Sequence, residues 1–70
     1  ALGNALDRST VGALIESLGH DPHPMVRGHA AWALGRIGSP QAIAALRREH
    51  RTEKNRAVQT EILAALEPFA

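Results

Sequence analysis

The side chains that could do chemistry here are four histidines and a set of cations between residues 27 and 56. Two of the histidines share one proline-containing turn with a carboxylate, His20-Asp21-Pro22-His23. A structural zinc site needs four ligands, and the sequence has no cysteine to complete one. Turn chemistry is therefore the better interpretation of this segment, and we predict no metal site.

No nucleophile stands in a catalytic motif. Ser9, Ser17 and Ser39 lie at expected helix starts or within helices, and the glycines at 35 and 38 lack the preceding strand of a phosphate loop. Without cysteine the chain can hold neither a disulfide framework nor a cysteine-bound iron–sulfur cluster. We expect a binding role, no catalytic residue and no cofactor within the chain.

The formal charge of +1 conceals an uneven distribution, with −2 in residues 1–26, +5 in 27–56 and −2 in 57–70. Closely spaced cations can bind successive phosphates of a nucleic acid. The alternative is a solvated face in which Glu49 and Glu53 are local partners. The candidate RNA-binding residues are Arg36, Arg47, Arg48, Arg51, Lys54 and Arg56. Arg27 is expected instead to contact an acidic group in a turn, such as Asp21.

An internal repeat gives the organisation of the chain. At a shift of 32 residues, residues 1–3 match 33–35, Leu14 matches Leu46, Asp21 matches Glu53, and Val26 matches Val58. A period of this length is typical of stacked helical pairs. The expected domain is a repeat over 7–38 and a terminal repeat over 39–70, preceded by the end of a truncated repeat in 1–6. This arrangement predicts a C-terminal fragment of a larger protein.

Apolar spacing and cap residues predict four helices. The first starts after Asp7 or Ser9 and ends near Leu18. The second starts at Pro24 and ends before Gly38. The third has Ser39 and Pro40 at its start and ends near His50, and the fourth follows Asn55 and ends before Pro68.

The predicted fold is therefore all-α, a short α-α superhelix of two antiparallel helix pairs. Arg47 and His50 replace Ile15 and Leu18 in the second repeat, as expected of a terminal, capping repeat. The alternative is that Arg47 binds a ligand. One core is expected from Leu14, Leu18, Val26, Leu34, Ile43, Leu46, Val58, Ile62 and Leu66.

The helix predicted to start at Pro24 carries Gly28, Ala31 and Gly35 along one side, with Trp32 beside them. Glycine inside a helix costs up to about 1 kcal/mol relative to alanine, so something should come close to this backbone. We expect contact with a neighbouring helix, domain or partner; RNA is the alternative.

Residues 21–38 resemble HEAT-like repeats of the phycobilisome lyase type, in which a turn with Asp and Pro leads into Val-Arg and an Ala-Leu-Gly helix end. More narrowly, residues 29–35 together with residues 1–4 resemble the C-terminal repeats of epoxyqueuosine reductases, tRNA-modification enzymes of queuosine biosynthesis.

This resemblance implies an oxidoreductase as the parent protein, with its iron–sulfur clusters and cobalamin in upstream domains. The repeats would help to hold tRNA, and the upstream domain of the same protein would be a further partner. A generic protein–protein scaffold is the alternative function. No apolar run is long enough to span a bilayer, so we expect no membrane partner and a cytoplasmic location.

Overall fold

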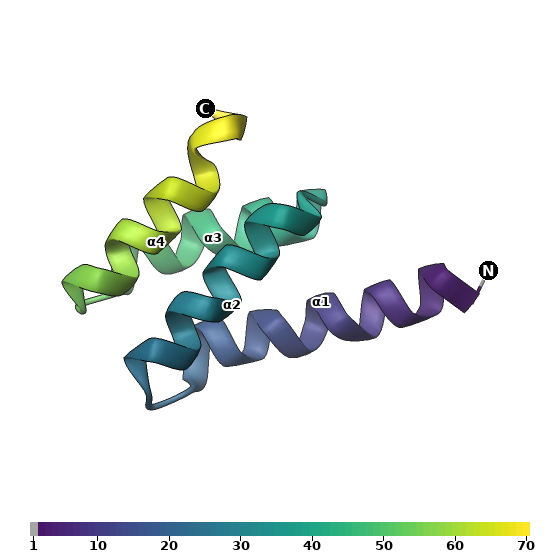
Figure 1. Cartoon of the computed structure of the whole chain (residues 1–70), viewed down its shortest axis with the longest axis horizontal. Helices are drawn as coiled ribbons and strands as arrows, with labels where there is room; N and C mark the ends of the chain where they lie inside the picture. The colour runs from purple at the N-terminus through teal and green to yellow at the C-terminus, as the bar shows by residue number, and fades with distance from the viewer. Residues whose placement is uncertain (1) are drawn as a thin grey trace.

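The computed structural model describes the backbone of residues 2–70 and the side chains of residues 10–70. Residues 2–70 form four α-helices and a short 3-10 turn (Figure 1). The elements in chain order are α1 (Leu2–His20), α2 (Pro24–Ile37), α3 (Pro40–Thr52), α4 (Arg56–Leu66) and η1 (Glu67–Phe69). The predicted all-α fold is confirmed.

Local sequence chemistry sets most helix ends where it was predicted to. Pro24 occupies the first turn of α2, and Gly38 ends that helix in the left-handed conformation with φ of 65°. The Ser39 hydroxyl accepts a hydrogen bond from the Ala42 N–H, and the Asn55 side chain accepts one from the Val58 N–H, each at 3.2 Å. These side chains satisfy donors that the first turns of α3 and α4 would otherwise leave without partners.

The start of the first helix was predicted wrongly. α1 begins at Leu2 and continues past Asp7 and Ser9, which had been expected to cap it. Aspartate and serine are good caps, but they stop a helix only weakly when the residues before them are helix formers such as alanine and leucine. At the other end α3 continues to Thr52, past the expected end at His50.

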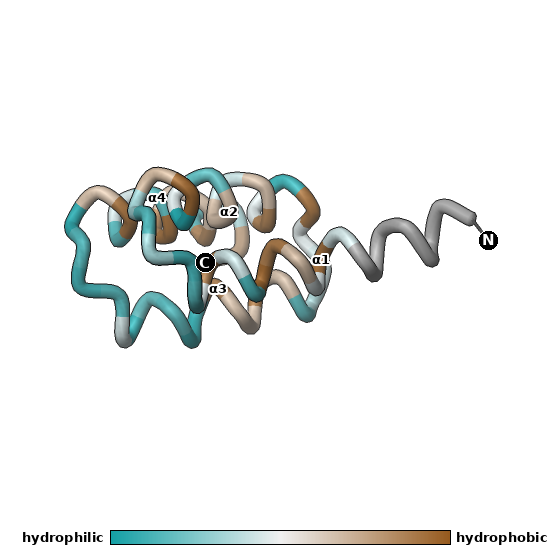
Figure 2. The backbone as a smooth tube through the Cα atoms, turned by 90° about the horizontal axis from the view of Figure 1, so that it is seen from below, coloured by the Kyte–Doolittle hydropathy of each residue, from teal (hydrophilic) through white to brown (hydrophobic). Residues whose placement is uncertain are grey.

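The helices lie in two layers. In Figure 2, α2 and α4 form the upper layer, while α3 and the described part of α1 lie below them. α2 is central to the packing, because it contacts α1, α3 and α4. The neighbouring repeats are therefore joined mainly through their second helices, α2 and α4.

One apolar core fills the space between the layers. Leu18, Leu34, Leu46, Val58 and Ile62 are its largest fully buried side chains, and they come from all four helices. Leu14 and Leu66 are partly buried against them. Alanine supplies much of the remaining core, at positions 30, 31 and 42. The small residues let the helices approach closely, so a thin core still excludes water.

Two predicted core residues are in fact outside the buried cluster. Val26 is 39% exposed, although its repeat equivalent Val58 is buried. The difference arises because α2 covers Val58, whereas no helix in the described part of the chain covers Val26 in the same way. Ile43 is only half-buried.

None of the helices in the described residues is both long enough and apolar enough to cross a bilayer.

Candidate functional site

Three of the candidate RNA-binding residues, Arg47, Arg48 and Arg51, are exposed on α3. The Nε of Arg48 lies 3.3 Å from Oε2 of Glu49, an ion pair in which the arginine side chain remains mostly in water. Arg47 turns toward the C-terminus, where its Nη2 donates to the Phe69 carbonyl oxygen at 3.4 Å. The ion pair of Arg48 and the long hydrogen bond of Arg47 are both exposed and therefore weak, so these two guanidinium groups can exchange their partners for a phosphate.

Lys54 and Arg56 continue the row of cations beyond α3. Both side chains are exposed, and they flank Asn55, which caps α4. The cap fixes the backbone between Lys54, in the loop after α3, and Arg56, at the start of α4, and neither cation contributes to the core. Arg48, Arg51, Lys54 and Arg56 are defined here as the basic surface.

Arg36 does not belong to this surface. It lies near the end of α2, in the other layer, and its Cζ is 5.5 Å from the centroid of the Trp32 ring. This distance is within the range of a cation–π interaction. The structure therefore places Arg36 with the aromatic residue and apart from the cations of α3.

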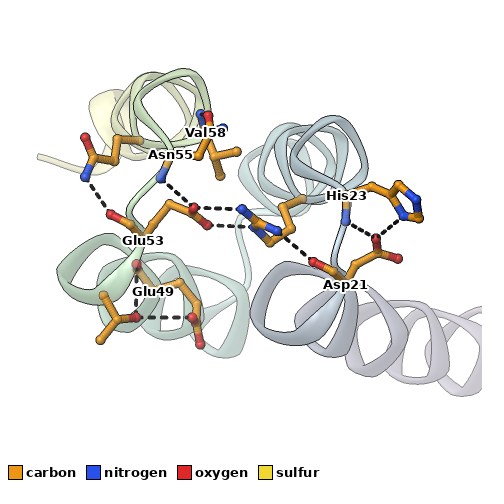
Figure 3. Close-up of polar contacts among 9 residues, drawn as sticks. Asp21, His23, Glu49, Glu53, Asn55 and Val58 are labelled. Carbon is orange, nitrogen blue, oxygen red and sulfur yellow. Dashed lines mark hydrogen bonds and ion pairs between the residues drawn. The ribbon is translucent and has the colours of Figure 1, made fainter.

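A polar network joins the turns of the two repeats, and Figure 3 shows its contacts around Asp21 and Glu53. Arg27 donates from Nε to Oε1 of Glu53 at 2.9 Å and from Nη2 to Oε2 at 3.0 Å. Its Nη1 donates to the backbone carbonyl of Asp21 at 2.8 Å. The Glu53 side chain is only 7% exposed. Arg27 is thus a structural residue, as expected, and no part of the basic surface.

The carboxylate partner of Arg27 was not predicted, although the sequence held the signal. Asp21 offers only its carbonyl oxygen, while Glu53, its equivalent in the next repeat, provides the carboxylate. The hydrogen bonds from Arg27, together with those from the Asn55 and Lys54 backbone, lower the pKa of Glu53 below its usual value. The same contact raises the pKa of Arg27.

The turn at residues 20–23 is built by hydrogen bonds. The Asp21 carboxylate accepts from the His23 N–H at 2.8 Å and lies 3.2 Å from His23 Nδ1. The backbone contact with His23 lowers the pKa of Asp21. Among the residues that the structure describes, no cluster of three or more His, Cys, Asp or Glu side chains could hold a metal ion.

The glycine stripe of α2 faces α4. A methyl group placed on Gly35 would lie 2.7 Å from Cβ of Ala65, and one placed on Gly28 would lie 3.6 Å from Cγ of Glu61. Ala31 is fully buried between these positions. The predicted neighbour of Gly28, Ala31 and Gly35 is thus α4 of the same chain, which leaves these three residues no room for RNA or another protein.

Trp32 is different from the stripe beside it, because 59% of its surface is exposed. Met25, two turns earlier on α2, is 75% exposed. Trp32 also borders a groove of about 530 Å³ on the side of α2 that faces α1. We call these two exposed apolar side chains, Met25 and Trp32, the Trp32 surface.

Comparison with known proteins agrees with this architecture. The chain matches the family model of HEAT repeats over residues 1–67. It is 37% identical over 67 residues to an epoxyqueuosine reductase of Bacillus subtilis, a match that covers 96% of this chain and 17% of that protein. An epoxyqueuosine reductase of Listeria monocytogenes is 41% identical over 58 residues, which are 83% of this chain and 15% of the relative.

A Geobacillus stearothermophilus protein, named as an uncharacterized protein in the gldA 3′ region, is 36% identical over 67 residues. That match covers 96% of this chain and 31% of the relative, so the chain spans less than a third of the length of these proteins. No solved structure is a significant match. The repeat sequence, the layered helix pairs and the match over residues 1–67 together show that the chain belongs to the HEAT repeat family and resembles a segment of epoxyqueuosine reductases.

Proposed function

We propose that this chain is a non-catalytic repeat module of an epoxyqueuosine reductase-like protein, and that it binds tRNA through the basic surface. The assignment to an epoxyqueuosine reductase-like protein is supported by the relatives named as epoxyqueuosine reductases. The choice of tRNA as the partner is supported by the charge of +5 in residues 27–56 and by the position of the cations on the surface.

The observation that carries the proposal is the exposure of Arg48 and Arg51 on α3, of Lys54 in the loop that follows, and of Arg56 at the start of α4. Phosphate groups of RNA recur at regular intervals along the backbone. A row of guanidinium and ammonium groups can neutralise several of them, and each contact releases counterions. Such contacts fix the position of an RNA without reading its sequence.

Reduction chemistry in such a protein would belong to other domains. The chain has no cysteine for an iron–sulfur cluster. In the described residues the histidines and carboxylates are also not gathered into a ligand set. The contribution of this module to a cytoplasmic tRNA-modification enzyme would therefore be binding and orientation of the substrate.

The test is tRNA binding by the chain and by its Arg48→Gln, Arg51→Gln double variant, measured at low and at physiological salt. We expect weaker binding in the variant and a shallower dependence of log K on log salt, by about 1 for each lost phosphate contact. The control is a Thr10→Glu, Gln41→Glu variant, which changes the net charge equally at exposed sites outside the basic surface. Equal affinities for both variants would contradict the proposal.

A second candidate function is a protein–protein scaffold, and the exposed Trp32 surface favours it. Apolar contacts gain little from low salt, so binding through this surface should be nearly independent of ionic strength. A Trp32→Ala variant separates the two candidates. It should weaken binding of a protein partner and leave the salt dependence of tRNA binding unchanged.

A further inference from the structure

The 32-residue repeat makes it possible to compare equivalent surfaces of α2 and α4. α4 packs against α2 through Val58, Glu61 and Ala65, and the α2 side of this interface is the glycine stripe. The equivalents of these α4 residues on α2 are Val26, His29 and Ala33. All three line the 530 Å³ groove between α1 and α2. The helices α1 and α4 lie on opposite sides of α2 (Figure 1).

The equivalent surfaces are covered to very different degrees. Val58 is 1% exposed beneath α2, whereas Val26 is 39% exposed. Leu14, which matches the fully buried Leu46, is also only partly buried at the edge of the groove. The surface on α4 is thus covered by a helix, α2. Among the described residues, no helix covers the equivalent surface on α2 in this way.

We propose that the groove formed by Leu14, Val26, His29 and Ala33 is the seat of a further helix of the α2 type. This helix would belong to an additional HEAT-like repeat, stacked on α2 as α2 is stacked on α4. Its contact stripe would carry small residues at the positions of Gly28, Ala31 and Gly35. Small residues are required because the existing contact between α2 and α4 is very close. A methyl group placed on Gly35 would lie only 2.7 Å from Cβ of Ala65.

A second copy of this chain is a poor occupant. The equivalents of Gly28, Ala31 and Gly35 on α4 are Thr60, Leu63 and Glu67, which are too large for the same close approach. The corresponding stripe of α2 is covered by α4. Neither α2 nor α4 of a second copy therefore offers the required surface. A separate repeat with its own exposed glycine stripe is the occupant that fits.

The test is an extended chain in which residues 7–38 are duplicated ahead of the original residue 7. The added copy carries Trp32→Phe, so that the original Trp32, at the edge of the groove, is the single fluorescent reporter. We expect docking to raise the midpoint of thermal unfolding and to shift the Trp32 emission to shorter wavelength, because the ring leaves water.

Ala33→Arg in the original copy should abolish both effects, because Ala33 would face the glycine stripe of the added helix. The same substitution should leave the 70-residue chain folded, since Ala33 borders an open groove. Ala44→Arg, at an exposed site on α3, is the matched control and should change neither effect. A blue shift that survives Ala33→Arg, or an extended chain with no blue shift, would overturn the proposal.

A disulfide test does not depend on a gain in stability. The sequence has no cysteine, so an introduced pair reports unambiguously. Gly28→Cys in the added helix should form a disulfide with His29→Cys in the original copy. This pair is the repeat equivalent of the observed contact between Gly28 and Glu61. Gly28→Cys with Ala44→Cys should remain reduced. Cross-linking of both pairs alike, or of neither, would contradict the proposed seat.

Discussion

Arg27 and Glu53 form a bidentate ion pair between the turns of successive repeats, with N–O distances of 2.9 and 3.0 Å. The third donor of the arginine, Nη1, reaches the Asp21 carbonyl, so one side chain ties three segments together: its own helix, the preceding turn and the next turn. Two parallel hydrogen bonds to a nearly buried carboxylate define the register of one repeat on the next.

This pair predicts a pH-dependent stability. The pKa of Glu53 is lowered by Arg27, so its contribution is complete above the unfolded value of 4.5 and is lost as the pH falls from there through the lower folded value. Glu53→Gln should therefore destabilise the chain at neutral pH, and the difference from the wild type should shrink in acid. Urea unfolding at about pH 7 and about pH 3 measures this difference.

Glu16→Gln is the control for that experiment, because the Glu16 side chain is exposed beside His20. It should change the stability little at either pH. If Glu53→Gln and Glu16→Gln behaved alike, the ion pair would have no role in joining the repeats.

The second prediction concerns the core. Leu34 is fully buried in α2 among residues from the other helices, and Leu34→Ala should lower the free energy of unfolding by roughly 2–5 kcal/mol. Small domains have only about 5–15 kcal/mol in total, so much of the population could unfold. Leu63→Ala removes the same atoms from a side chain that is 53% exposed and should cost no more than about 0.5 kcal/mol. Circular dichroism during urea titration gives both values, and similar losses would contradict the described core.

Much of the fold could be predicted because its signals are local. Pro24, Gly38, Ser39 and Asn55 act on their own helix ends through backbone conformation or a single hydrogen bond. Each effect reaches only three or four residues along the chain, so the sequence around the residue contains all the necessary information.

The errors concern properties that depend on neighbours distant in the sequence. Val26 and Val58 have the same residue type and the same repeat position, yet only Val58 is covered. The partner of Arg27 lies 26 residues away and could be found only by applying the repeat period to Asp21. The basic surface had a visible charge signal, but the placement of Arg36 in the other layer depends on how the helices pack.

A pair of glycine substitutions tests the contact between α2 and α4. Gly35→Ala would place a methyl group 2.7 Å from Cβ of Ala65, so the helices must move apart, at a cost of roughly 1–3 kcal/mol. Gly12→Ala, in α1, meets no atom within 4 Å and should stabilise the chain by up to about 1 kcal/mol, because alanine is the better helix former. Thermal unfolding followed by circular dichroism compares the two. A stabilising Gly35→Ala would show that α4 does not approach this stripe so closely.

The last prediction separates the cations of the two layers, and it rests on the proposed binding of tRNA. Arg51 is exposed on α3 within the basic surface, while Arg36 is held over the Trp32 ring on α2. An RNA backbone that follows α3 would contact Arg51 and pass by Arg36. Arg51→Glu should therefore weaken tRNA binding and reduce the salt slope by about 1, whereas Arg36→Glu should leave the slope unchanged despite the same change in net charge. Both variants should retain the wild-type unfolding midpoint within a few degrees, since neither side chain is in the core. Equal losses of affinity would mean that tRNA responds only to the overall charge of the module, and a larger loss for Arg36→Glu would move the RNA path to the layer of α2 and α4.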